Sequence, residues 1–259
     1  MKNFIKVLLI ILLFIFMIYI FHNFIWLRYQ RKHGFEKSNI EISEGSQNSP
    51  FSISKVIVYS SAYGENKNTT FQQSNWILNI FQYSDIAIYI ENKADELNTA
   101  NTVKKLYLEN LSISTPALGS PSLYYLDSLN FGTPNRNENY KIDDSIEFTV
   151  LNDTNETNTI QYNTPVFFTD CSNPITLKYV NSSIKENFTI FSNEPVFFNG
   201  KLLEMAGVEL KDLETIIRFR IHVVNYENED FYYDLSLPMP FENETNSVLE
   251  RKYFGGKKF

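Results

Sequence analysis

The stretch Ile53–Ser61, with the sequence ISKVIVYSS, carries the pattern that decides the fold. Val56 and Val58 occupy one set of alternate positions, and Lys55 and Tyr59 belong to the other set. Successive side chains of a β-strand point to opposite faces, so a period of two predicts a half-buried strand. This segment is rich in β-branched and aromatic residues, which strands favour.

Similar short runs recur along the chain and are separated by clusters of Asn, Gly, Pro, Ser or Asp. Many short strands with turn signals between them are typical of an all-β sandwich or barrel. We therefore predict an antiparallel β-sandwich, Ig-like or jelly-roll-like, with a hairpin at 216–225 and 231–237 and a short helical turn at 208–214. Further strands are expected near 76–82, 85–91, 103–113, 145–151, 159–163, 165–169, 175–180, 187–191 and 195–198.

The turn-rich and polar segments suggest the domain boundaries. We expect the sandwich body at 51–240, a polar stalk at 38–50 before it and a polar tail at 241–259 after it. The loop 114–140 is long and rich in Pro, Gly, Ser and Asn. A body of two subdomains that divide near 115–140 is therefore the alternative to a single sandwich.

The N-terminal segment 1–37 is predicted to anchor the chain in a membrane. Phe4–Leu27 is almost wholly apolar, and as a helix it would be about 36 Å long, enough to cross a lipid bilayer. A cleaved signal peptide is the competing interpretation. Because no small-residue cleavage site follows Leu27, a retained single-pass anchor is favoured.

Two kinds of sequence feature predict opposite orientations for this anchor. Lys2 and Lys6 precede the apolar segment, whereas four basic residues follow it between Arg28 and Lys37. By the positive-inside rule this distribution places the body in the cytoplasm, although long domains translocate largely regardless of charge. A β-rich body and an anchor at the extreme N-terminus favour export, so we expect an extracytoplasmic body.

The composition narrows the classes of partner. The chain has a formal net charge of −7 and one cysteine, Cys171. An acidic protein is repelled by phosphate backbones, so we expect no nucleic-acid partner. A single cysteine excludes an internal disulfide. We also expect no cofactor and no metal, because no nucleotide, dinucleotide or zinc motif occurs.

No recognisable catalytic motif occurs in the body. His22 and His33 lie in or beside the apolar segment, and only His222 belongs to the body. A nucleophilic pair of Cys171 and His222 lacks the local sequence context of known cysteine enzymes. We therefore predict no catalytic residues and favour a protein that is not an enzyme.

Three basic side chains share one face of a predicted strand. In Ile217–Val223, alternation places Arg218, Arg220 and His222 on one side and apolar residues on the other. Such a stripe could hold a carboxylate or phosphate. The alternative is a solvated outer face in which Asp234 and Ser236, across the hairpin, balance the charge.

The long loop offers a second candidate binding surface. Tyr124, Tyr125 and Phe131 could present aromatic rings to a sugar or to another protein. They could equally fill the end of the sandwich. The candidate ligand-binding residues are thus Tyr124, Tyr125, Phe131, Arg218, Arg220 and His222.

These features favour a membrane-anchored binding or scaffolding module with a protein or cell-wall glycan as ligand. A cell-wall-associated enzyme without a local motif is one alternative. An accessory subunit of a membrane complex, with its anchor packed on partner helices, is another.

Overall fold

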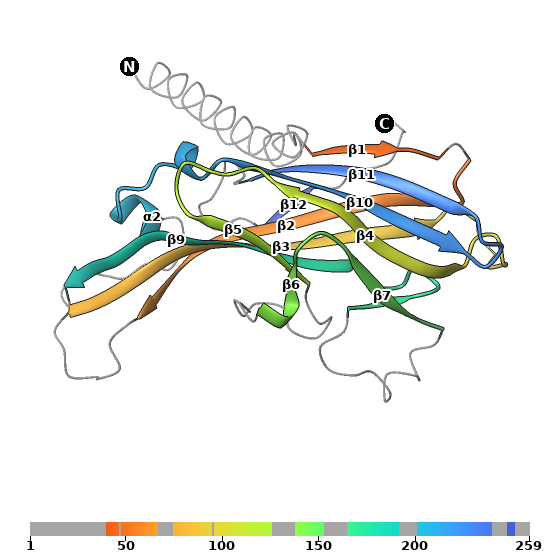
Figure 1. The fold of residues 1–259 in the computed structure, drawn as a ribbon, viewed down its shortest axis with the longest axis horizontal. Helices are drawn as coiled ribbons and strands as arrows, with labels where there is room; N and C mark the ends of the chain where they lie inside the picture. Colours follow the sequence, from red (N-terminus) through yellow and green to blue (C-terminus); the bar gives the residue numbers. More distant parts are fainter. Residues whose placement is uncertain are drawn as a thin grey trace, which may run out of the picture. The chain divides into compact units, whose positions relative to one another are not determined.

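The computed structural model of the protein describes residues 40–46, 48–66, 75–94, 96–125, 138–152, 165–191, 201–239 and 248–251. These residues form an almost entirely β-structure with two six-stranded sheets, which confirms the all-β prediction (Figure 1). The predicted anchor at 4–27 lies outside this part of the chain, as do the strands expected at 159–163 and 195–198. Among the described residues, no helix has the length and apolar character that crossing a membrane requires.

The first sheet, here called sheet A, has the strand order β1-β11-β10-β4-β7-β8. Neighbouring strands are antiparallel except for β7 and β8, which are parallel. Its strands are β1 (Glu41–Glu44), β11 (Asp230–Met239), β10 (Thr215–Asn225), β4 (Val103–Ile113), β7 (Ile146–Leu151) and β8 (Val166–Phe168).

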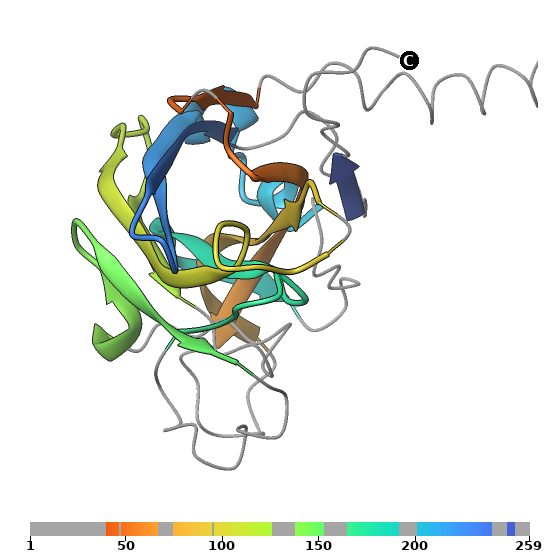
Figure 2. The same cartoon turned by 90° about the vertical axis from the view of Figure 1, so that its right-hand side faces the viewer.

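The second sheet, here called sheet B, has the order β12-β2-β3-β9-β5-β6 and is antiparallel throughout. Figure 2 shows the two sheets facing each other across the core. The strands of sheet B are β12 (Val248–Arg251), β2 (Phe51–Asn66), β3 (Asn75–Asn92), β9 (Ile175–Phe191), β5 (Ser120–Tyr125) and β6 (Lys141–Ile142).

Alternating apolar residues make the core between the sheets. On β10, Ile217, Phe219 and Ile221 are buried, whereas the residues between them are at least partly exposed. Tyr233 of β11 fastens sheet A to the start of β2, because its hydroxyl donates to the carbonyl oxygen of Phe51 at 2.9 Å. The side-chain oxygen of Ser49 lies 2.6 Å from the same hydroxyl. Each bond made by a buried hydroxyl avoids a desolvation penalty.

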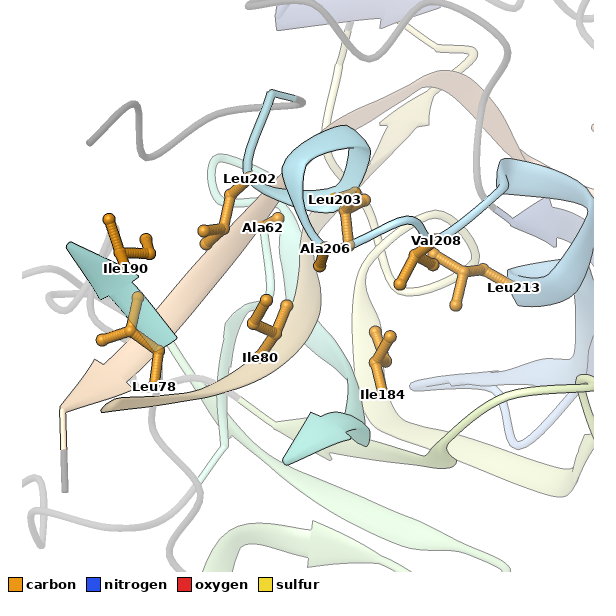
Figure 3. Packing of buried hydrophobic residues seen from close by; sticks show 10 residues of the cluster. All are labelled: Ala62, Leu78, Ile80, Ile184, Ile190, Leu202, Leu203, Ala206, Val208 and Leu213. Carbon is orange, nitrogen blue, oxygen red and sulfur yellow. The ribbon is translucent and has the colours of Figure 1, made fainter. Parts of the chain in front are cut away.

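A short helix covers part of sheet B. Helix α2 (Lys201–Met205) packs Leu202 and Leu203 against inward residues of β2 and β3, including Ala62 and Ile80 (Figure 3). The helical turn predicted at 208–214 is present as the 3-10 helix η3 (Leu210–Leu213), which buries Leu213 in the same cluster. A second 3-10 turn, η1 (Glu138–Tyr140), precedes β6. Helix α2 was not predicted.

Two predicted breaks between strands are wrong. The segments expected at 76–82 and 85–91 form the single strand β3, because Ser84 between them is buried and bonds to Ser60 of β2 at 2.6 Å. Likewise, 175–180 and 187–191 belong to the continuous strand β9. Its polar middle contains Ser183 with φ of 57°, within an irregularity in the β3–β9 pairing, so a bulge replaces the expected turn.

Three segments predicted as loop, stalk or tail contain strands. The loop predicted at 114–140 includes β5, which pairs with β9. Part of the stalk predicted at 38–50 is β1, paired with β11, and part of the tail predicted at 241–259 is β12, paired with β2. Residues Asn39–Phe259 form one compact unit. The edge of a sheet presents unpaired backbone N–H and C=O groups, and a polar segment can pair with them. The local composition of the segment does not reveal this pairing.

Candidate functional site

The outer face of sheet A collects charged and aromatic side chains from three adjacent strands. It is defined here by the residues of β4, β10 and β11 that point away from the core. The pairing of β10 with β11 and β4 sets its rows, although the β10–β4 register shifts between Arg218 and Arg220. The rows contain Ser112, Arg218 and Ser236; Glu109, Arg220 and Asp234; and Tyr107, His222 and Tyr232.

His222 lies at the centre of the aromatic row. Its ring lies 5.3 Å from that of Tyr107 and 4.6 Å from that of Tyr232, measured between centroids. Nδ1 is 3.0 Å from a carboxylate oxygen of Glu109, and Nε2 is 2.7 Å from a carboxylate oxygen of Asp230. Both ring nitrogens therefore have acidic partners within the protein, and the two tyrosines hold the ring in place.

Arg220 is also paired within this face. Its Nε donates to one oxygen of Asp234 at 2.8 Å, and its Nη2 donates to the other at 3.1 Å. The guanidinium also lies over the Tyr232 ring at 5.3 Å. The hydrogen bond to Asp234 is the main cause of the raised pKa of Arg220. The prediction that Asp234 balances the charge of this face is confirmed.

Arg218 differs from both neighbours. It is exposed on β10, and among the described residues it makes no ion pair. Ser112 and Ser236 lie directly opposite it on the two flanking strands, and Glu41 of β1 lies beyond Ser236. Within the described part of the chain, the guanidinium of Arg218 thus has no carboxylate partner and has a hydroxyl residue on either side.

The aromatic residues predicted from the loop lie elsewhere. Tyr124 and Tyr125 belong to β5 and are buried, with 5% and 8% exposure. Tyr124 packs with Phe81 and Val180, so its ring does not present a face to solvent. The alternative in which these rings fill the sandwich agrees with their burial. Phe131 lies outside the described residues.

The five candidate residues that the structure describes therefore do not form one site. Arg218, Arg220 and His222 share the outer face of sheet A, as alternation predicted, whereas Tyr124 and Tyr125 belong to sheet B. Only the first group remains together as a candidate surface.

Cys171 and His222 do not form a nucleophilic pair. The thiol of Cys171 donates to the side-chain oxygen of Asn92 at 3.5 Å, and both nitrogens of His222 bond to carboxylates. Burial, with a smaller contribution from Asp170, raises the pKa of Cys171 to about 12. The reactive form of cysteine is the thiolate, so this side chain is a poor nucleophile near neutral pH.

Sequence reasoning missed Ser112 and four charged or aromatic residues of this surface. Tyr107 and Glu109 alternate with apolar residues along β4, and Asp230 and Tyr232 do so along β11. This period of two was the available signal, since it places each pair on an outer face. It could not show that β4 neighbours β10, because that pairing joins strands far apart in the sequence.

Comparisons with known proteins found no match for this chain. A scan against protein-family models found no family that matches this chain. Searches of curated proteins and of solved structures also returned no match. Its function is therefore inferred from geometry and chemistry alone.

Proposed function

We propose that this protein is a single-pass, membrane-tethered β-sandwich that binds a carboxylate-bearing polymer outside the cytoplasm, such as a cell-wall glycan. In this proposal the apolar segment Phe4–Leu27 is the tether and the outer face of sheet A is the binding surface. The protein acts by binding rather than by catalysis.

The observation that carries the proposal is the open guanidinium of Arg218. Arg220 and His222 already have carboxylate partners, whereas Arg218 has none among the described residues. A planar guanidinium binds a carboxylate through two parallel hydrogen bonds. Ser112 and Ser236 on either side add hydroxyls that match the hydroxyl-rich surface of a sugar polymer.

The rest of the outer face supports a repeating ligand. The adjacent, tilted rings of Tyr107, His222 and Tyr232 and the paired carboxylates give a rigid, polar surface beside Arg218. A rigid surface loses little conformational entropy on binding. A long polymer can contact several such surfaces at once on one membrane, which increases the overall avidity without strong single sites.

Co-sedimentation of the full-length protein, reconstituted in lipid nanodiscs, with insoluble polysaccharides tests the binding. Cross-linked polygalacturonate serves as the carboxylate-bearing probe, and cross-linked dextran serves as the neutral one. Arg218→Gln is expected to weaken binding to polygalacturonate about tenfold, the loss expected for one charge-assisted hydrogen-bonding group.

The matched control is Lys185→Gln, which removes one exposed positive charge from β9 of sheet B. It is expected to leave binding unchanged. Equal binding of Arg218→Gln and Lys185→Gln, or equal binding of wild type to dextran, would overturn the proposed function.

The tether is tested separately. Carbonate washing of membranes is expected to leave the full-length protein in the pellet, and a protease added to intact cells is expected to digest the body. Release by carbonate would contradict the anchor. Protection from protease would contradict the orientation.

A further inference from the structure

The centre of sheet B contains an ion pair that is almost completely shielded from water. Asp85 of β3 and Lys178 of β9 are directly opposite each other in the pairing of these two strands. Nζ of Lys178 lies 3.0 Å from a carboxylate oxygen of Asp85, and the two side chains are 0% and 8% exposed. An amine and a carboxyl group are therefore held together in a fixed place.

The surroundings of the pair are aromatic and apolar. Nζ of Lys178 lies 5.2 Å from the centre of the Tyr83 ring. Tyr124 of β5 is opposite Lys178 on the other side and packs with Phe81 and Val180. Among the described residues, the pair is thus buried beside aromatic and apolar side chains.

A buried ion pair is a poorly stabilised state in such a region. Removing both charges from water costs several kcal/mol for each ion, and their attraction often fails to offset this. Burial accordingly raises the pKa of Asp85 above its usual value, and the neighbouring Lys178 only partly opposes the effect. Burial thus moves the equilibrium of Asp85 towards the neutral carboxyl group, which is the form that an amine can attack.

We infer that Asp85 and Lys178 react with each other after folding and form an amide bond between the two side chains. The geometry that carries this inference is the 3.0 Å approach of the amine to the carboxyl group, buried between adjacent central strands. The product replaces two buried charges with one neutral amide, and the burial that makes the pair unfavourable makes the amide favourable.

The reaction balances within the pair. The ammonium of Lys178 gives one proton to the carboxylate of Asp85, which leaves a neutral amine and a neutral carboxyl group. The amine nitrogen attacks Cγ of Asp85, a carbon–nitrogen bond forms, and the carbon–oxygen bond to the hydroxyl breaks. The hydroxyl takes a second proton from the nitrogen and departs as water. No group is oxidised or reduced, and no other reagent is needed.

The bond would tie together the two strands that lie in the middle of sheet B, where β3 and β9 are neighbours. The chain holds no disulfide, since Cys171 is its only cysteine. The amide would supply the covalent cross-link that a disulfide provides in other exported proteins, and reducing agents would not open it.

Peptide mass spectrometry of the full-length wild-type protein tests the inference directly. The protein is purified from membranes, unfolded and digested with trypsin. The expected result is one branched peptide that joins the segments containing Asp85 and Lys178 and is lighter than their sum by one water molecule. Trypsin is also expected to leave the bond after Lys178 uncut. Two linear peptides with free side chains would overturn the inference.

Two controls show that burial is the cause. Lys93 and Glu44 form an exposed ion pair with an N–O distance of 3.8 Å, so their peptides are expected to stay linear in the same digest. In Lys178→Arg, which keeps the cation but removes the amine, all peptides are expected to be linear. A cross-link at Lys93 and Glu44, or one that persists at Asp85 in the arginine variant, would also overturn the inference.

Discussion

Two acidic–basic pairs with almost equal N–O distances lie in different surroundings in this protein. Arg220 and Asp234 approach to 2.8 Å on the outer face of sheet A, with side chains 37% and 49% exposed. Lys178 and Asp85 approach to 3.0 Å in sheet B and are almost fully buried. The first pair keeps most of its hydration, so it contributes little stability and remains available at a surface. The Lys178–Asp85 pair has lost its hydration, so its contribution to stability depends on whether the two side chains stay charged.

The N–O distance alone therefore does not determine how much each pair contributes to stability. At the surface, water and salt screen the attraction between Arg220 and Asp234. The pair therefore serves mainly to hold the Arg220 side chain in place on the outer face of sheet A. In the interior, removing Lys178 leaves the carboxyl group of Asp85 buried without this cation.

The largest effect is expected from Lys178→Met. This change leaves the carboxyl group of Asp85 buried without its cation and prevents the proposed amide. The free energy of unfolding should fall by at least about 3 kcal/mol. Chemical denaturation followed by circular dichroism measures this. Lys185→Met on the exposed part of β9 is the matched control and should change the stability little. Equal effects of the two changes would contradict the importance of burial.

A double variant distinguishes a simple ion pair from the proposed amide. In Lys178→Met combined with Asp85→Leu, no buried charge remains, so a simple ion pair would be replaced without loss of stability. If the wild type contains the amide, the double variant also loses a covalent cross-link and should stay about 2–4 kcal/mol less stable than wild type. Urea denaturation distinguishes the two results, and full recovery of stability would argue against the cross-link.

A smaller gain is expected at Tyr179, the neighbour of Lys178 that faces the core. Its hydroxyl is buried and has no hydrogen-bond partner among the described residues. Tyr179→Phe should therefore stabilise the protein by about 1 kcal/mol near neutral pH. Tyr233→Phe, which removes a hydroxyl bonded to Phe51 and Ser49, should destabilise it instead. Thermal unfolding of both variants checks the opposite signs.

The gain at Tyr179 should grow in alkaline solution. Burial raises the pKa of Tyr179 above its model-peptide value of 10.0. As the pH rises past 10, the unfolded state releases this proton while the folded state keeps it, so the contribution of Tyr179 to stability declines. Phenylalanine has no proton to release. A difference between Tyr179→Phe and wild type that stayed constant above pH 10 would contradict the burial of the hydroxyl.

The smallest effect is expected from Asp234→Ala on the outer face. Its pair with Arg220 is exposed, so its loss should lower the free energy of unfolding by less than about 1 kcal/mol. Added salt should reduce this difference, because exposed charges are screened. Denaturation at low and high ionic strength measures both points. A loss as large as that of Lys178→Met would remove the distinction between the two pairs.

The alternation of apolar and polar residues predicted the class of fold and which side chains lie on each face of a strand. The pattern around Val56 and Val58 indicated a half-buried strand, and the pattern from Ile217 to Val223 separated core residues from Arg218, Arg220 and His222 correctly. These features depend on residues two positions apart, which the sequence displays directly. Strand limits were less predictable. Ser84 resembles a turn residue until its bond to Ser60 is seen, and β5 resembles part of a loop until it pairs with β9.

By itself, the sequence determined the β class, the apolar N-terminal segment and the division of charged and apolar side chains on β10, because each is written in neighbouring residues. The tertiary structure was needed to show that Tyr107 and Tyr232 enclose His222 and that Asp85 meets Lys178 away from water. It was also needed to show that Arg220 and His222 have carboxylate partners, whereas Arg218 has none among the residues that the structure describes. Those neighbours come from strands distant in the chain, and their register is fixed by burial of the whole sheet rather than by any local pattern.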